Sequence, residues 1–145
     1  MREGPDGTRD VTLYLWGGAL IPQIVSDHLG MTPHAAAAKG DPRGKPERGL
    51  RVKLGFWELT ARTDGLDVSA HIDELLGYFQ NWRTPLTDVP GVDDAAIDIY
   101  VIHRDDTYEL EFTLAQIAAL QRLGLRVMVT AVHSSEYDSG VRGGG

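Results

Sequence analysis

The chain has 145 residues, of which 42% are hydrophobic and 24% are charged, and its formal net charge is -7. This length and composition indicate one globular domain with a single core. Cysteine is absent from the sequence, which excludes disulfides, thiolate nucleophiles and cysteine-ligated zinc. The acidic balance argues against nucleic acid as a partner, because phosphate binding depends on Lys and Arg. With no run of about 18 apolar residues and no apolar leader, we expect a cytoplasmic protein that does not bind membranes.

The first part of the chain predicts a strand, a helix and a second strand. Residues 11–16 alternate apolar and amphipathic side chains, which is typical of a strand covered in part on both faces. Residues 21–29 carry apolar side chains at helical spacing, and Gly30 is suited to end the helix. After a segment rich in proline and glycine, alternation returns in residues 50–61. Its phase changes at positions 55–56, which indicates a bulge or the true start of the strand.

The second part predicts two helices and three strands. A helix with an Asp67 N-cap runs to about residue 79, and Thr113 with Gln116 forms a capping box that opens a helix ending near Gly124. Residues 125–131 alternate as a last strand. Two further alternating segments are separated by a short polar turn, which favours an antiparallel hairpin. These two segments are residues 97–102 and residues 108–112.

This order of elements favours an α+β fold. Hairpins and only three amphipathic helices fit a two-layer sandwich, with a mainly antiparallel sheet and the helices on one face. The pairs Gln23-Ile24 and Gln116-Ile117 each open a helix that follows a strand, so an internal pseudo-repeat is one interpretation. We expect a single domain over residues 10–133, between a flexible N-terminus (1–9) and a flexible Gly-rich tail (134–145).

Several short motifs occur in an order found in a known family. They are Leu29-Gly30-Met31-Thr32-Pro33, Lys39-Gly40-Asp41-Pro42, Trp57-Glu58-Leu59 and a closing Leu120-x-x-Leu123-Gly124-Leu125. In this combination the chain resembles the bacterial domain-of-unknown-function family DUF4279 over about residues 10–133. The resemblance implies a compact α+β domain, and it brings no catalytic residues to transfer to this sequence.

The basic segment is the clearest functional candidate. Residues 39–53 contain six Lys and Arg against two acidic residues, which gives +4 and leaves -11 for the remainder of the chain. Charges more than a Debye length of about 8 Å apart are largely screened, so this segment should present local positive potential. We expect it to recognise an acidic protein or an anionic small molecule, with the ring of Trp57 as an apolar wall. The candidate ligand-binding residues are Lys39, Asp41, Arg43, Arg48, Arg51 and Trp57.

Two alternatives remain open at this point. In the first, Lys39 and Asp41 only shape the loop, and the other cations are solvated or pair with Glu109 and Glu111. In the second, the protein is a small enzyme that acts on an anionic metabolite in a pocket beside the loop. Its proton-transfer candidates are Asp41, His34 and His103.

The sequence contains no motif for a cofactor, and no catalytic triad pattern selects a nucleophile. His103 and His133 end strands that we expect to be neighbours, with Asp105 close by, but none of the five histidines has the i, i+4 spacing of a helical metal pair. We therefore expect no metal site and no cofactor, and a non-catalytic binding or regulatory domain is favoured over an enzyme.

Overall fold

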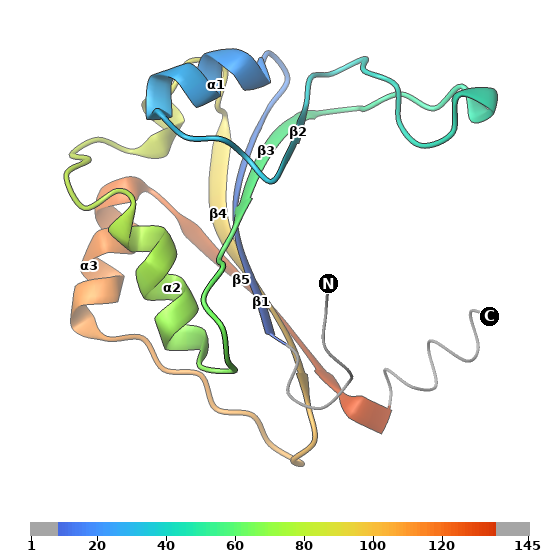
Figure 1. Ribbon diagram of the computed structural model, residues 1–145. Helices are drawn as coiled ribbons and strands as arrows, with labels where there is room; N and C mark the ends of the chain where they lie inside the picture. The colour runs from blue at the N-terminus through green and yellow to red at the C-terminus, as the bar shows by residue number, and fades with distance from the viewer. Residues whose placement is uncertain (1–8, 136–145) are drawn as a thin grey trace.

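The computed structural model describes residues 9–135 (Figure 1). Our expectations for residues 1–8 and 136–145, including the terminal Gly-Gly-Gly, lie outside the described residues. Among the described residues, no helix has the length and apolar character needed to cross a bilayer.

A five-stranded open sheet forms one layer of the molecule, in the order β2-β3-β1-β4-β5. Neighbouring strands are antiparallel except for β4 and β5, which are parallel. The sheet is therefore mixed but mainly antiparallel, as predicted. The strands are β1 (Arg9–Gly17), β2 (Ala35–Ala37), β3 (Gly55–Thr60), β4 (Asp94–His103) and β5 (Arg126–His133).

Three helices form the second layer and lie on one face of the sheet (Figure 1). The helices are α1 (Pro22–Leu29), α2 (Val68–Gly77) and α3 (Leu114–Leu123), and two 3-10 turns, η1 (Pro46–Arg48) and η2 (Leu86–Asp88), lie in connections. The predicted end signals are confirmed: Gly30 adopts φ 69°, Asp67 accepts from the Ser69 N–H, and Thr113 and Gln116 form the capping box. These caps satisfy backbone groups that a helix end leaves without partners.

The core lies between the helices and the sheet. Alternation along β1 turns Val11, Leu13 and Leu15 toward the helices, where each is fully buried. The opposite side of β1 carries Tyr14 and Trp16 on the sheet face that none of the three helices covers (Figure 1). We call this second side the open face. The predicted α+β class, with three helices on one face of the sheet, is confirmed.

The expected hairpin of residues 97–102 with 108–112 is wrong. Residues 104–113 form no strand, and β4 pairs instead with β5, which follows α3. Tyr108, Leu110 and Phe112 do pack against the core while Glu109 and Glu111 are exposed, so the alternation was real. However, β5 takes the edge of β4 that a hairpin strand would have needed. The suggested internal pseudo-repeat stays a prediction.

Candidate functional site

Residues 38–54 leave the sheet between β2 and β3 and project from the body as a narrow arm (Figure 1). We call this segment the arm. Its two sides are held together by backbone hydrogen bonds, so the segment is an ordered hairpin-like structure and not a free loop. The bonds run from Gly40 N–H to Val52 O (2.8 Å), from Val52 N–H to Asp41 O (2.9 Å) and from Arg43 N–H to Leu50 O (2.9 Å).

The turn chemistry of the arm explains its prolines and glycines. Pro46 begins η1 at the tip, and Gly49 follows it with φ 63°, a left-handed conformation that favours glycine. The side chain of Asp41 accepts a 2.8 Å hydrogen bond from the Ala38 N–H at the base. Asp41 therefore shapes the arm, as the first alternative expected of it.

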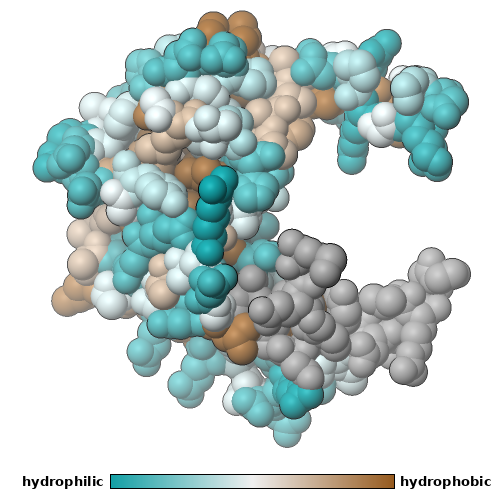
Figure 2. All heavy atoms as spheres, viewed as in Figure 1, coloured by the Kyte–Doolittle hydropathy of each residue, from teal (hydrophilic) through white to brown (hydrophobic). Residues whose placement is uncertain are grey.

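The predicted cations lie along this arm and are exposed to solvent. Arg43 lies opposite Leu50 on the side of the arm that leads to the tip, and Arg48 is in the tip turn. Within residues 9–135, none of the arm's Lys or Arg side chains forms an ion pair, so the alternative of pairing with Glu109 and Glu111 is not observed there. The arm thus presents its positive charge to solvent, and Figure 2 shows its hydrophilic side chains standing away from the body.

Trp57 does not belong to this surface, and the prediction is corrected here. Its exposed fraction is 0%, and its indole N–H donates a 3.0 Å hydrogen bond to Oγ of Ser26 in α1. The physical reason is the alternation of β3, which turns Trp57 toward the core and Phe56 toward the open face. The aromatic wall beside the arm is formed by Phe56 and Trp16 instead.

A groove of about 620 Å³ lies between the base of the arm and the open face. Arg43 and Lys53 line it from the arm, and Trp16, Phe56 and Glu58 line it from β1 and β3. The groove therefore combines two cations, an apolar aromatic surface and one carboxylate. A concave site with an apolar lining and a few polar groups is the usual form of a ligand-binding site.

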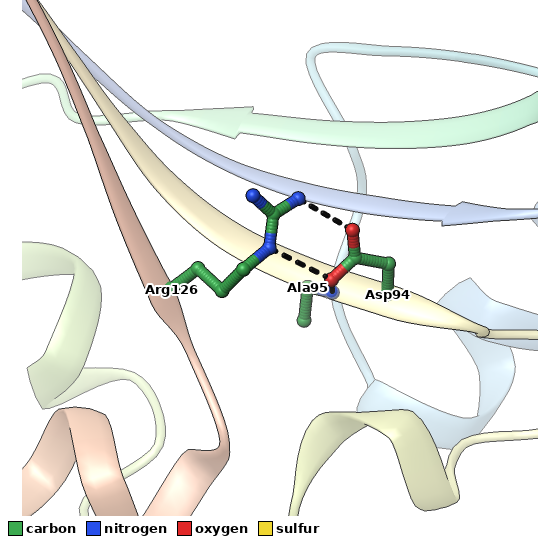
Figure 3. Close-up of polar contacts among 3 residues, drawn as sticks. All are labelled: Asp94, Ala95 and Arg126. Atoms are coloured by element: carbon green, nitrogen blue, oxygen red, sulfur yellow. Dashed lines mark hydrogen bonds and ion pairs between the residues drawn. The ribbon is translucent and has the colours of Figure 1, made fainter.

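A second groove of about 290 Å³ shares Trp16 and Leu54 with the first. It extends the site toward β5, where Arg126 reaches across β4 to bind both carboxylate oxygens of Asp94 (Figure 3). The Arg126 guanidinium lies 5.9 Å from the ring centroid of Trp16, and Trp16 stacks on Tyr14 at 5.3 Å with an interplanar angle of 2°. The Trp16 ring therefore has contacts with both an aromatic ring and a cation, and each such contact favours this ring position.

The surroundings of Glu58 and Asp94 shift the pKa values of these two carboxyl groups in opposite directions. Partial burial raises the pKa of Glu58 above its usual 4.5, and Asp98 adds to the increase, although a hydrogen bond from Tyr14 and the charge of His34 oppose it. The hydrogen bond from Arg126 lowers the pKa of Asp94 despite the opposing effect of burial. Glu58 is thus a carboxyl group of the groove that takes up a proton at a higher pH than an ordinary Glu does.

The histidine pair lies elsewhere. His103 and His133 are paired in register and their rings are 5.6 Å apart, which confirms that they end neighbouring strands. Nδ1 of His103 is 2.8 Å from the carbonyl of Asp105, and Nε2 of His133 is 2.7 Å from the carbonyl of Arg104. Among the described residues, no cluster of three metal-binding side chains occurs. His103 ends β4 whereas the groove lies at its beginning, so His103 is not part of the groove.

The described domain coincides with the extent of a family match. The model of the family described as "Domain of unknown function (DUF4279)" matches residues 7–132. The chain belongs to this family. No match was found among curated proteins or among solved structures. This description of the DUF4279 family names no activity.

The part of the site that the sheet contributes was not predicted from the sequence. Trp16 and Phe56 were both placed in strands, but their outward phase was not used to select them. Glu58 follows the buried Trp57 and was overlooked for the same reason. Arg126 carried no signal, because its link to Asp94 depends on the parallel pairing of β4 and β5.

Proposed function

We propose that this DUF4279 domain is a non-catalytic binding or regulatory domain that recognises an anionic ligand or an acidic protein surface in the groove below the arm. One observation carries the proposal: Arg43 and Lys53, which have no ion-pair partner among the described residues, line the same groove as the rings of Trp16 and Phe56. A ligand with an anionic group and an apolar part is complementary to both. The charge of the arm stands apart from the acidic remainder of the chain, which favours capture of such ligands by long-range attraction.

The exposure of the cations limits the affinity that each contributes. Exposed ion pairs contribute about 0.2 to 1 kcal/mol each, and charge-assisted hydrogen bonds about 1.5 to 3 kcal/mol when the ligand excludes water. Arg43 and Lys53 are exposed, so the smaller values apply until a ligand covers them. Contact with the Trp16 and Phe56 rings would supply that cover, and we therefore expect affinity to need both the charge and the apolar part of the ligand.

Binding of synthetic peptides tests the proposal. Fluorescence anisotropy is measured with labelled peptides rich in glutamate and phenylalanine, and with serine-for-glutamate versions of them. The double variant Arg43→Glu, Lys53→Glu should lower affinity for the acidic peptides about tenfold or more, since 1.4 kcal/mol corresponds to tenfold. Lys45→Glu, Arg48→Glu is the matched control, because it changes the charge of the arm equally at residues that do not line the groove.

The comparison of the two variants shows whether the peptides bind in the groove or to the charge of the whole arm. A large loss in the first variant with a small loss in the control supports the groove, whereas equal losses assign binding to the charge of the arm as a whole. No binding of any acidic peptide, or binding that both variants leave unchanged, contradicts the proposal. Circular dichroism and melting of each variant should match the wild type, since all four side chains are exposed.

The raised pKa of Glu58 favours one alternative, a small enzyme that acts on an anionic metabolite in the same groove. Perturbed carboxyl groups in clefts are frequent in catalytic sites. Glu58 would then take the proton-transfer role, with His34 as the nearby charged group. Of the earlier candidates, Asp41 holds the base of the arm and His103 lies at the other end of β4. A ligand bound with Glu58→Gln but converted only with Glu58 present would favour the enzyme.

A further inference from the structure

Strand β5 forms one edge of the sheet and carries a row of backbone groups with no strand beside them in the described residues. It is eight residues long, which corresponds to about 26 Å at 3.3 Å per residue. The opposite edge, β2, has only three residues, and the arm begins directly after it. The two edges therefore differ greatly in the length of backbone that they offer to a further strand.

Within residues 9–135, β5 lacks most of the features by which proteins usually protect an edge strand. Such edges contain proline, charged side chains (especially lysine) or a bulge, or they are covered by another segment. The sequence of β5, RVMVTAVH, contains no proline and no lysine, and its arginine, Arg126, stands at the first position and binds Asp94 of β4. The pairing of β5 with β4 runs without a bulge from Ala96↔Arg126 to His103↔His133. A long regular edge of this kind pairs readily with another strand.

The valines of β5 are exposed although they lie on the helix side of the sheet. Val127 is 38% exposed and Val129 is 47% exposed, whereas their direct partners on β4, Ile97 and Ile99, are fully buried. The difference arises because the sheet ends at β5, so nothing described covers the outer side of these valines. Exposed apolar side chains beside an unpaired backbone edge are typical of a protein interface.

We propose that β5 pairs with β5 of a second copy of this chain, antiparallel about a two-fold axis at Val129, to give a continuous sheet of ten strands. Side chains alternate between the two faces along a strand, so the helix sides of both copies coincide only when odd-numbered residues pair with odd-numbered residues and even with even. This register meets that condition, because it opposes Val129 with Val129, Val127 with Ala131, Met128 with Thr130, and Arg126 with Val132. The exposed valines of both copies then meet on the helix side.

The charge of the molecule favours this strand as the place where two copies meet. The chain carries a net charge of -7, so two copies repel each other over most of their surfaces. β5 contains no acidic residue, and the proposed register opposes its Arg126 with an uncharged residue. Antiparallel pairing through one edge also closes after two copies, because each copy has a single long edge. Both grooves would then open on the same side of the dimer.

Light scattering coupled to gel filtration tests the proposal on the full chain. The wild type should elute at about 31.8 kDa, twice the monomer mass of 15.9 kDa. Val129→Lys should shift it to the monomer mass, since a charge at the centre of the interface would face its own copy. Leu50→Lys is the matched control, because Leu50 is also 47% exposed but lies on the arm, and it should leave the dimer intact.

Hydrogen exchange supplies the second measurement. In the wild type, the β5 amides that point toward β4 and those that point toward the outer edge should both be protected from exchange. In Val129→Lys the outward-pointing amides, about half of the strand, should lose this protection, with no change elsewhere in the sheet. A wild type that is a monomer at high micromolar concentration overturns the proposal. So does a dimer that survives Val129→Lys, and a dimer lost in Leu50→Lys alone would assign the interface to the arm. None of these outcomes depends on ligand binding in the groove.

Discussion

The indole N–H of Trp57 in β3 donates a 3.0 Å hydrogen bond to the hydroxyl oxygen of Ser26 in α1, and the ring itself is fully buried. This contact joins the first helix to the sheet at a position where the helix contributes only Val25 and Leu29 to the core. It also explains a Trp at the start of β3 without any role in binding, since a buried indole needs a partner for its N–H.

Removal of the Ser26 hydroxyl should destabilise the domain. In Ser26→Ala the indole N–H of Trp57 loses its partner, and a buried donor without a partner costs about 1 to 3 kcal/mol. Chemical denaturation should show a decrease of this size in the free energy of unfolding. Thr87→Ala removes an exposed hydroxyl and should change the stability by less than about 0.5 kcal/mol. A loss below that value in Ser26→Ala would mean that water replaces the hydroxyl.

The close approach of β1 to the segment before β4 depends on a glycine. A Cβ at Gly17 would lie 1.8 Å from the carbonyl oxygen of Gly91, whereas a Cβ at the neighbouring Gly18 would meet nothing within 4 Å. Gly17→Ala should therefore destabilise the fold by about 3 kcal/mol or move the backbone, and Gly18→Ala should be nearly neutral. Thermal unfolding of the two variants checks this, and equal melting temperatures would contradict the packing described at the end of β1.

The elements that sequence predicted well are those whose pattern is local. The three helices were found because each has an apolar stripe together with an N-cap, a terminating glycine or both within about ten residues. The phase change at 55–56 correctly marked the start of β3 at Gly55. Trp57 shares its phase with Leu59 and Ala61, and this pattern is consistent with its burial. It was instead assigned to the binding surface because it lies near the basic segment in the sequence.

The features that sequence did not predict depend on distant partners. Residues 108–112 have the alternation of a strand but lie beside no strand, because β5 pairs with β4 after the crossover through α3. The three alanines of β2 have no pattern that distinguishes a strand, yet they pair with β3 and set the direction of the arm. The groove combines residues of the arm, β1 and β3, so it exists only after the sheet is assembled.

Glu74 should make stability depend on acid pH. Partial burial opposes its ionisation, but hydrogen bonds from the Thr63 hydroxyl, the Tyr78 hydroxyl and the backbone N–H groups of Arg62 and Thr63 outweigh it and lower its pKa to about 2. A depressed pKa contributes stability above the unfolded value of 4.5, and that contribution is lost as the pH falls toward 2.

In Glu74→Gln this dependence should become weaker between pH 4.5 and pH 2, and the variant should be less stable than the wild type at pH 7. Urea denaturation across this pH range measures the effect. Tyr78→Phe removes one of the donors and should give an effect of the same sign but smaller size. Parallel stability curves for wild type and Glu74→Gln would contradict the role of Glu74 in joining α2 to the segment that follows β3.

Glu58 should show the opposite sign. Its pKa is raised in the folded protein, so its effect on stability is most favourable below the unfolded value of 4.5 and is lost as the pH rises through the folded value. The free energy of unfolding of Glu58→Gln should therefore equal that of the wild type in acid and exceed it at neutral pH. The variant should also bind anionic peptides more tightly, because a negative charge leaves the groove.

Asp94→Asn is the control of opposite sign. Arg126 lowers the pKa of Asp94, so the Asp94→Asn domain should be less stable than the wild type at neutral pH. Urea denaturation between pH 4 and pH 8 compares the two variants, and a Glu58→Gln domain less stable than the wild type at neutral pH would show that its carboxylate has a partner that outweighs burial.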